Sequence, residues 1–455
     1  MNRIKKATPF IMMLMLTALV GCGSDNKETP EAPARVSPVV TETIEKTAIS
    51  TPVPTATDTP APEPTEAPQL SEEEIYWQQV LESFGNSKYD LTAALTEPAL
   101  KDIVNGAYLF GVGINGSTLE NQTLNIPEYM AVSKKHFNSC TMTNLMKSGY
   151  LLNQAASKAN LEAGNGEPAV NFECINPTLQ WCKDNDMIMR GHTLVWHAQA
   201  PDWFFKEGYD STKPYVDKDT MLFRMESYIR QVLTHVQTEY PGVIYCWDVV
   251  NEAVDPDYGD KESGFLCRKQ NEGEDNPWYM TIGPEYVEAA FTFARKYAAP
   301  DVKLFYNDFN TYQNGKMQAI YTLCESLKEK KLIDGIGMQG YWGLTYPTQD
   351  AISSAIKYFA KLDLEIHITE LSVGVDTENE AEFEKQAKYY GNLFYMFRTL
   401  DSDFGGPANI TAVTVFGLVD HYREGDTTNT RLFDKDYQPK PAFYKIRDVI
   451  KNTYK

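Results

Sequence analysis

Short β-rich runs that alternate with amphipathic stretches constrain the fold of this chain more than any other feature. Eight such runs follow one another at residues 109–115, 137–144, 187–196, 243–252, 303–310, 333–340, 364–373 and 412–420. Between them, apolar residues recur at helical spacing, for example over residues 221–240 and 284–297. Strands that alternate with helices pair in parallel through right-handed crossovers. Eight such units therefore predict a single α/β domain with a closed (β/α)8 barrel, the TIM-barrel fold.

Two of these runs are apolar along most of their length but carry acids near their ends. The run at 243–252 ends on Asn251 and Glu252, and the run at 364–373 carries Glu370 in the sequence ITEL. Because the chemistry of such barrels lies at the C-terminal ends of the strands, we expect the two glutamates to share one mouth. Paired acids there indicate glycoside hydrolysis, in which one carboxyl protonates the leaving oxygen and the other attacks or activates water. Taken singly, each glutamate also fits a solvated strand end or half of a salt bridge.

The segment at the end of the third run is typical of a sugar-binding surface. It reads RGHTLVWHAQAPDWFF over residues 190–205 and gathers two imidazoles, two indoles and a glutamine. Aromatic faces stack on sugar rings, while the polar groups hydrogen-bond the hydroxyls. Together with WDVVNEA and ITEL, this segment resembles the family-10 glycoside hydrolases, the endo-β-1,4-xylanases. The resemblance also takes in FNSCTMTNLMK, KLFYNDFN, IDGIGMQG and TVFGLVD, one motif per strand, over about residues 95–450.

The resemblance implies an endo-acting hydrolase that cleaves the β-1,4-xylosidic bonds of xylan with retention, by double displacement. It gives Glu252 the role of general acid/base and Glu370 that of nucleophile. Substrate contacts implied in the same way are Asn144, Lys147, His192, Trp196, Gln199, Asn251, Gln339, Tyr341 and Phe416. Retention requires the two carboxyl groups to lie about 5–5.5 Å apart, where mutual repulsion raises the pKa of one of them. No metal or organic cofactor is implied, and the sequence shows no cysteine and histidine cluster with metal-ligand spacing.

Five departures from the family pattern surround the expected sugar-binding side. Thr143 stands where the family has glutamate, Ser148 where it has tryptophan, and Tyr341 where it has histidine. Phe416 replaces a tryptophan of the last strand, and residues 422–424 read Tyr-Arg-Glu where Ser-Trp is expected. Because the catalytic pair is retained, these changes leave open a related barrel hydrolase that acts on a different β-glycan or on a decorated xylan.

The N-terminal residues predict export. Three basic residues precede an apolar stretch at 7–20 that is short for a membrane span and has the form of a signal-peptide core. The sequence LVGC then resembles a bacterial lipobox, which makes Cys22 the lipidated residue; an ordinary secretory signal with a chance cysteine is the alternative. The next segment contains nine prolines, nine threonines and no aromatic residue, which predicts a disordered linker. We therefore expect a signal peptide at 1–22, a linker at 23–70 and the catalytic barrel at 71–455.

The charge of the chain limits its partners. It carries 42 basic against 62 acidic residues, a formal charge of −20. This charge repels phosphate backbones, so we expect no nucleic-acid partner, whereas a neutral polymer is acceptable. We expect a monomer that is held on the outside of a bacterial cell membrane through its lipid alone. A non-catalytic carbohydrate-binding lipoprotein, such as the substrate receptor of a transporter, is a third interpretation, but it has no need of two convergent glutamates.

The cysteines that follow the lipobox allow two interpretations. Cys140 and Cys246 lie within strand runs and are expected to be small core residues. Cys174 with Cys182, or Cys267 with another cysteine, are candidates for disulfides in an oxidising exterior. The connectivity does not follow from the sequence.

Replacement of Cys22 by serine should abolish membrane attachment. Serine offers no thiol to acylate, so the protein should be released or should keep its signal peptide. Cell fractionation and the mass of the N-terminal peptide measure this, and globomycin treatment of the parent should have the same effect. Unchanged membrane retention in both cases would contradict the lipobox interpretation.

Overall fold

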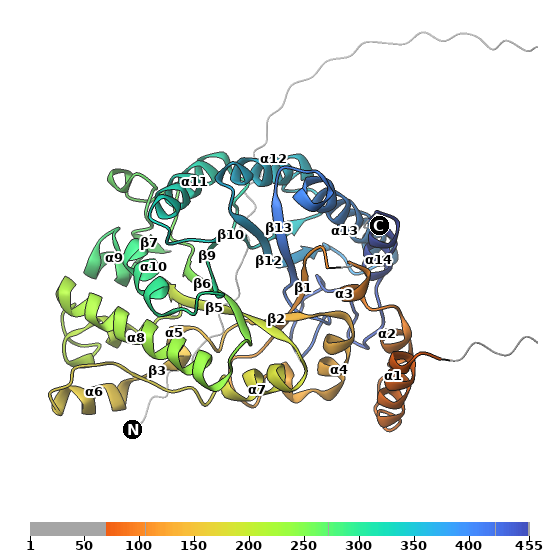
Figure 1. Cartoon of the computed structure of the whole chain (residues 1–455), viewed down its shortest axis with the longest axis horizontal. Coiled ribbons are helices and arrows are strands. Elements are labelled where there is room, and N and C mark those ends of the chain that lie inside the picture. Colours follow the sequence, from red (N-terminus) through yellow and green to blue (C-terminus); the bar gives the residue numbers. More distant parts are fainter. Residues whose placement is uncertain (1–69, 105, 272, 424, 454–455) are drawn as a thin grey trace, which may run out of the picture. The chain divides into compact units, whose positions relative to one another are not determined.

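Eight strands pair in parallel around a closed barrel in the computed structural model, which describes residues 70–453 except Asn105, Glu272 and Glu424 (Figure 1). The barrel strands are β1 (Leu109–Ile114), β2 (Ser139–Met142), β5 (Ile188–Trp196), β6 (Ile244–Asn251), β9 (Lys303–Asp308), β10 (Gly335–Met338), β12 (Glu365–Gly374) and β13 (Asn409–Val415). They follow the order β10-β9-β6-β5-β2-β1-β13-β12, and β10 pairs with β12 to close the ring. Each strand coincides with one predicted run, so the predicted TIM barrel is confirmed. The predicted signal peptide and all but the last residue of the predicted linker lie outside the described residues.

Helices link the barrel strands and surround them (Figure 1). They are α1 (Glu72–Ser83), α2 (Thr92–Thr96), α3 (Leu100–Ile103), α4 (Pro127–His136), α5 (Ser148–Leu151), α6 (Gln154–Glu162), α7 (Asn176–Asp184), α8 (Lys218–Glu239), α9 (Pro277–Ile282), α10 (Tyr286–Tyr297), α11 (Asn314–Glu329), α12 (Gln349–Phe359), α13 (Glu380–Leu400) and α14 (Pro441–Thr453). The helices predicted at 221–240 and 284–297 appear as α8 and α10. Between residues 70 and 453, no described helix is long and apolar enough to cross a membrane.

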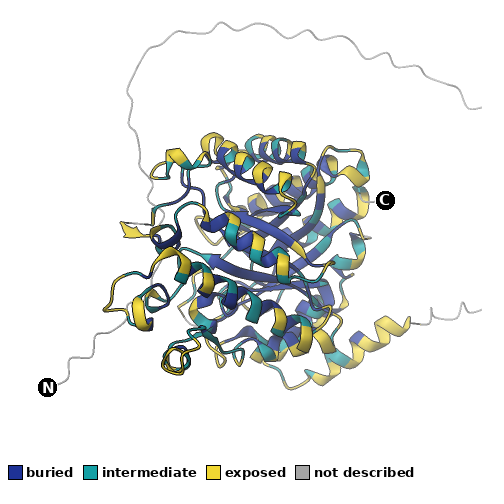
Figure 2. Cartoon of the chain, turned by 60° about the vertical axis from the view of Figure 1, so that its left-hand side comes forward, coloured by how far each residue is buried: buried dark blue, intermediate teal, exposed yellow. Residues whose placement is uncertain are grey.

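The helices bury one face each, and the strands are buried almost throughout (Figure 2). In α8 the buried face consists of residues at helical spacing, including Met225, Ile229, Val232 and Val236. Burial of such a face against the sheet stabilises a helix more than its intrinsic propensity does. The apolar periodicity of the sequence therefore determines which side of each helix faces the barrel.

Short strands that the sequence did not predict lie between the barrel strands. β3 (Leu152–Asn153) pairs with β4 (Ala169–Val170), and β7 (Gln270–Asn271) pairs with β8 (Glu274–Asp275), both antiparallel. β11 (Tyr341–Gly343) pairs in parallel with residues 372–374 of β12. Glu370 therefore lies inside β12 rather than at its end, because β12 continues alongside β11.

Buried polar residues share the barrel with apolar ones. Arg190 of β5 and Asp248 of β6 form a buried ion pair, in which Arg190 Nε donates to Asp248 Oδ2 at 2.9 Å. Gly337 of β10 leaves room for polar neighbours, since a Cβ there would lie 2.3 Å from Asn307 Oδ1 and 3.0 Å from Arg190 Nη2. Because an unpaired buried charge is costly, the ion pair favours this one register of β5 against β6.

The expectation of disulfides is wrong for the described chain. The cysteines after residue 69 are free thiols: Cys140, Cys174, Cys182, Cys246, Cys267 and Cys324. Because α7 turns Cys182 into the core, its Sγ meets Cys140 Sγ at 3.4 Å instead of pairing with Cys174. The Cys174 thiol donates to the Leu145 carbonyl at 3.6 Å. Cys140 and Cys246 are buried core residues, as predicted.

Asp401, directly after α13, is a buried acid with one unsatisfied oxygen. The residue is 2% exposed, and its Oδ1 accepts a hydrogen bond from the Asp403 backbone N–H at 2.9 Å. Its Oδ2 has no hydrogen-bond partner among the described residues. Burial raises the pKa of Asp401 to about 6 from an ordinary value of 3.8. The folded state therefore favours the neutral form of the Asp401 carboxyl group. The folded protein loses stability as the pH rises through about 6, because the buried carboxyl group must then ionise.

Replacement of Asp401 by asparagine should raise the free energy of unfolding by about 1–2 kcal/mol near pH 8, since no charge then has to be desolvated. The amide oxygen keeps the hydrogen bond to Asp403. Near pH 4 the gain should disappear, because the folded parent already carries a neutral carboxyl group. Denaturant unfolding at several pH values measures the difference, and an equal effect at every pH would contradict the assignment.

Candidate active site

Glu252 follows directly on β6 with a left-handed backbone, at φ +57°. Non-glycine residues rarely adopt this conformation. Two hydrogen bonds hold it: the Glu252 N–H donates to Asn307 O at 2.9 Å, and Arg268 Nε donates to Glu252 O at 2.9 Å. The half-buried carboxyl group accepts hydrogen bonds from Trp196 Nε1 at 3.0 Å and from Gln339 Nε2 at 2.8 Å. The backbone turn and these two donors fix where the carboxyl group points.

Glu370 is more deeply buried than Glu252, at 4% exposure. Asn307 Nδ2 donates to its Oε1 at 2.9 Å, and the Tyr341 hydroxyl donates to its Oε2 at 2.5 Å. The Glu370 backbone N–H donates to Gln339 O at 2.7 Å. One donor on each oxygen fixes the orientation of the carboxyl group and favours its ionised form.

Asn307 of β9 connects the surroundings of the two glutamates, and the sequence did not single it out. Its Nδ2 donates at 2.9 Å to Asn251 Oδ1 as well as to Glu370. The Thr369 hydroxyl donates to Asn307 Oδ1 at 2.7 Å, which sets the orientation of the amide. The signal was present in KLFYNDFN, because an amide and an acid end that buried run, as Asn251 and Glu252 end theirs.

His192 of β5 takes its orientation from the buried ion pair. Its Nδ1 lies 2.9 Å from Asp248 Oδ2, and Asp248 is held in turn by Arg190. A carboxylate at Nδ1 keeps the ring proton on that nitrogen and leaves Nε2 as an acceptor when the ring is neutral. The sequence predicted His192 as a substrate contact, but it did not predict these two supports.

Three of the predicted substrate contacts meet around a fourth, Lys147. Its Nζ donates to Gln199 Oε1 at 2.7 Å and to Asn144 Oδ1 at 3.2 Å. The same nitrogen lies 4.7 Å from the centre of the Trp196 ring. Burial lowers the pKa of Lys147 to about 8, although both glutamates act in the opposite direction. This group therefore combines hydrogen-bonding side chains with one aromatic face.

Aromatic residues form a second part of the mouth. Phe416 packs edge-on against Tyr341, with ring centres 6.1 Å apart, and against His192 at 6.4 Å. Thr143 and Ser148, which replace larger residues of the family pattern, are buried at 6% and 4% exposure. Every substrate contact expected from the sequence thus belongs to the network around the two glutamates or packs against it.

The electrostatic surroundings of the two glutamates differ. Burial outweighs the effect of His192 and of the hydrogen bonds from Tyr341 and Asn307, so the pKa of Glu370 is raised. Burial also acts to raise the pKa of Glu252, but the His197 imidazole and the Gln339 amide oppose it. With the cations Lys316 and Arg268, they bring the pKa of Glu252 below its ordinary value. Without a sugar in place, Glu252 is thus the stronger acid of the two.

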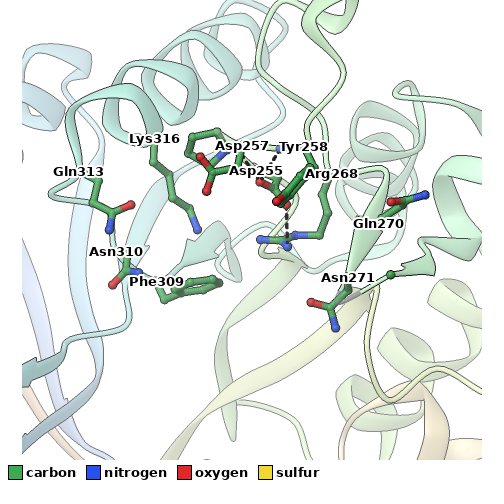
Figure 3. Close-up of a pocket in the computed structure, with 12 residues that line it drawn as sticks. Asp255, Asp257, Tyr258, Arg268, Gln270, Asn271, Phe309, Asn310, Gln313 and Lys316 are labelled. Atoms are coloured by element: carbon green, nitrogen blue, oxygen red, sulfur yellow. Dashed lines mark hydrogen bonds and ion pairs between the residues drawn. The ribbon is translucent and has the colours of Figure 1, made fainter. Parts of the chain in front are cut away.

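A cavity of about 640 Å³ lies among the loops that follow β6 and β9 (Figure 3). Its lining residues are Asp255, Pro256, Asp257, Tyr258, Arg268, Gln270, Asn271, Gly273, Phe309, Asn310, Gln313 and Lys316. Both cations are paired: Arg268 Nη1 lies 3.1 Å from Asp255 Oδ2, and Lys316 Nζ lies 2.7 Å from Asp308 Oδ1. The cavity therefore offers polar groups and the Tyr258 and Phe309 rings rather than an unpaired positive charge. Among the described residues, no group of histidine, cysteine and acidic side chains is arranged to hold a metal ion.

The fold and this site define a glycoside hydrolase of the (β/α)8 class, with carboxyl groups on the fourth and seventh barrel strands. The model of Glycosyl hydrolase family 10 matches residues 99–449, and the chain belongs to this family.

Several relatives carry names that refer to one activity. A putative endo-1,4-beta-xylanase of Caldicellulosiruptor saccharolyticus is 46% identical over 312 residues, which cover 66% of this chain and 96% of the relative. Endo-1,4-beta-xylanase B of Butyrivibrio fibrisolvens is 40% identical over 338 residues, 73% of this chain and 51% of that longer relative. The solved N-terminal modules of endo-1,4-beta-D-xylanase 10B from Clostridium thermocellum, complexed with xylohexaose, match with a TM-score of 0.70 and 30% identity. That match covers 78% of this chain and 67% of the solved one.

Replacement of Asn307 by alanine should lower kcat/KM on a xylo-oligosaccharide by roughly tenfold or more, the effect of losing a hydrogen bond to a charged group. Because the amide helps to lower the pKa of Glu370, its loss should also move the acidic limb of the pH profile upward. Thr369→Val is the matched control, since it removes only the donor that orients Asn307, and it should cost roughly fivefold. A kcat/KM of Asn307→Ala within twofold of the parent would show that the amide does not act on the nucleophile.

Proposed function

We propose that this chain is an endo-1,4-β-xylanase that cleaves xylan with retention of configuration. The observation that carries the proposal is the placement of Glu252 and Glu370, which one amide network joins at the mouth of the barrel. Asn251 and Asn307 donate to Glu252 and Glu370, respectively, and they bond to each other. Membership of Glycosyl hydrolase family 10 and the xylanase names of its relatives support the substrate.

Glu370 is the proposed nucleophile. Its carboxylate attacks the anomeric carbon, the bond to the leaving oxygen breaks, and the electron pair of that bond goes to the oxygen. The attacking group has to be fixed, and Glu370 has one donor on each oxygen and is nearly buried. The product of this step is an ester between Glu370 and the sugar.

Glu252 is the proposed acid and base. It protonates the leaving oxygen in the first step and takes a proton from water in the second. These roles require exchange of protons with solvent, which agrees with its half-buried position. Arg268 contacts the Glu252 carbonyl and also lines the cavity, so the cavity begins next to the acid. We assign the cavity to the part of the glycan that leaves first.

The pKa directions in the sugar-free protein are opposite to those that the first step needs. Glu252 must be protonated and Glu370 ionised, whereas the pKa of Glu252 is lowered and that of Glu370 is raised. A bound glycan acts on both: it displaces the water around Glu252, which raises that pKa, and its hydroxyls add donors to Glu370. The substrate thus completes the electrostatic arrangement that the reaction uses.

A second candidate is a related hydrolase for a decorated xylan or another β-glycan. It is favoured by the small residues Thr143 and Ser148 and by Tyr341, which stand where the family pattern has glutamate, tryptophan and histidine. These replacements remove family contacts to a linear chain and so weaken the preference for an undecorated glycan. Export and a lipid anchor at Cys22 remain part of the proposal, supported only by the sequence of the N-terminal segment.

Release of reducing sugar from a panel of β-glycans tests the function and separates the two candidates. Linear xylan should be cleaved internally, so that its viscosity falls before much reducing sugar appears. Glu370→Gln should abolish release, and a preference for a decorated xylan or another β-glycan would favour the second candidate. Absence of release from every glycan would favour a binding protein.

The roles of the two glutamates predict different responses to azide. With a dinitrophenyl glycoside, Glu252→Ala should accumulate the covalent intermediate, because this leaving group departs without protonation while water still lacks its base. Azide should enter the vacated space and yield a β-glycosyl azide. Rescue of Glu370→Ala, the matched variant, should instead give the α product. An α product from Glu252→Ala would exclude the proposed role of Glu252.

A further inference from the structure

Arg431 is a buried cation whose guanidinium group has no ion-pair partner among the described residues. It lies between β13 and α14 and is 8% exposed. Its backbone N–H donates to Asp420 Oδ1 at 2.8 Å, but Lys440 Nζ already pairs with Asp420 Oδ2 at 2.5 Å. Arg431 Nε is buried and has no hydrogen-bond partner in the described chain. Because a buried charge without a partner is costly, its presence suggests that the charge has a use.

The guanidinium group reaches the strands that carry the nucleophile. Arg431 Nη1 donates to Ser372 Oγ at 3.1 Å. Ser372 is the register partner of Tyr341 in the pairing of β12 with β11, and the Tyr341 hydroxyl donates to Glu370. Gly417 leaves space for this approach, since a Cβ there would lie 2.7 Å from Arg431 Nε. Arg431 is therefore linked to Glu370 through the Ser372 side chain, the backbone pairing of Ser372 with Tyr341, and the Tyr341 hydroxyl.

We propose that Arg431 is a positioning residue for the nucleophile: it holds Ser372 beside Tyr341, and its charge favours an ionised Glu370 that accepts the Tyr341 hydroxyl. The inference rests on the proposed function, in which Glu370 attacks as a carboxylate. A phenol donor alone contributes no positive charge, whereas a guanidinium remains charged at every working pH. Arg431 thus supplies a positive charge at Ser372, two positions along β12 from the nucleophile.

Arg431 acts electrostatically on the phenol that donates to Glu370. Burial and the neighbouring Glu370 raise the pKa of Tyr341 well above its ordinary value, so the phenol keeps its proton, and Arg431 acts in the opposite direction. The pKa of Glu370 itself is raised by burial, while His192 and the hydrogen bonds from Tyr341 and Asn307 act to lower it and Asp248 acts to raise it.

Other charged groups face the two ends of this arrangement. Near Glu370 stand Lys147 and Glu252, and near Arg431 stand Asp420, Lys440 and the phenols of Tyr129, Tyr390 and Tyr422. Substitution of Arg431 leaves all of these groups in place, so a change in the pH profile reports the charge of Arg431.

The test uses the pH dependence of kcat/KM on dinitrophenyl xylobioside, whose leaving group needs no acid, so that the acidic limb reports the ionisation of Glu370. Arg431→Met should raise the pKa of that limb by roughly half a unit, because a nearby positive charge is lost. Arg431→Lys keeps the charge and should restore the limb towards the parent. Arg230→Met is the matched control, since Arg230 pairs with Glu167 from the outer helix α8. The acidic limb of the pH profile of Arg230→Met should coincide with that of the parent.

Ser372→Asp provides a second test in which Arg431 stays in place. The new carboxylate would pair with the guanidinium and cancel its charge, so the acidic limb should again move upward. The inference would be overturned if the acidic limb has the same pKa as in the parent in both Arg431→Met and Ser372→Asp, while the parent hydrolyses the substrate. If Arg431→Met does not fold, the result for Ser372→Asp alone decides. A parent that releases neither dinitrophenolate nor reducing sugar would overturn the proposed function, and the inference with it.

Discussion

The pairing of β10 with β12 closes the barrel, and the two halves of the site meet because of it. Gln339 follows β10 and contacts both glutamates: its side chain donates to Glu252, and its carbonyl accepts from the Glu370 N–H. Asn307, on β9 next to β10, joins Glu370 to Asn251. In a closed parallel barrel, all strands end at one rim, so residues far apart in the chain become neighbours.

Three buried cations of the barrel domain form ion pairs with buried acids. Arg190 is paired with Asp248, Lys316 with Asp308, and Lys440 with Asp420. Each pair offsets part of the cost of removing its charges from water. Arg431 has no such ion pair among the described residues, and its guanidinium donates to Ser372, which lies two positions after Glu370 in β12. A cost in stability at that position is consistent with a role in the chemistry.

The replacement of the family's histidine by Tyr341 changes the physics next to Glu370. An imidazole gains and loses its charge near neutral pH, whereas a phenol with a raised pKa stays neutral and donates one hydrogen bond. The surroundings of the nucleophile therefore keep a constant charge over a wider pH range. In the same mouth, burial lowers the pKa of Lys147 to about 8 and that of His197 to about 4.

The sequence by itself determined the eight strands, the helices at 221–240 and 284–297, and the positions of Glu252 and Glu370, because burial periodicity and strand-end acids are local patterns. The resemblance of its local motifs to the family also predicted substrate contacts, from Asn144 to Phe416.

Only the tertiary structure decided which partners these residues have. Asn307, Asp248 and Arg268 acquire their roles through contacts across strands and loops. The candidate disulfide between Cys174 and Cys182 is not formed, because α7 directs Cys182 towards Cys140. Arg431 lies 61 positions after Glu370 (431 − 370). No local pattern links them, because their connection exists only where β11 and β12 pair at the rim of the closed barrel.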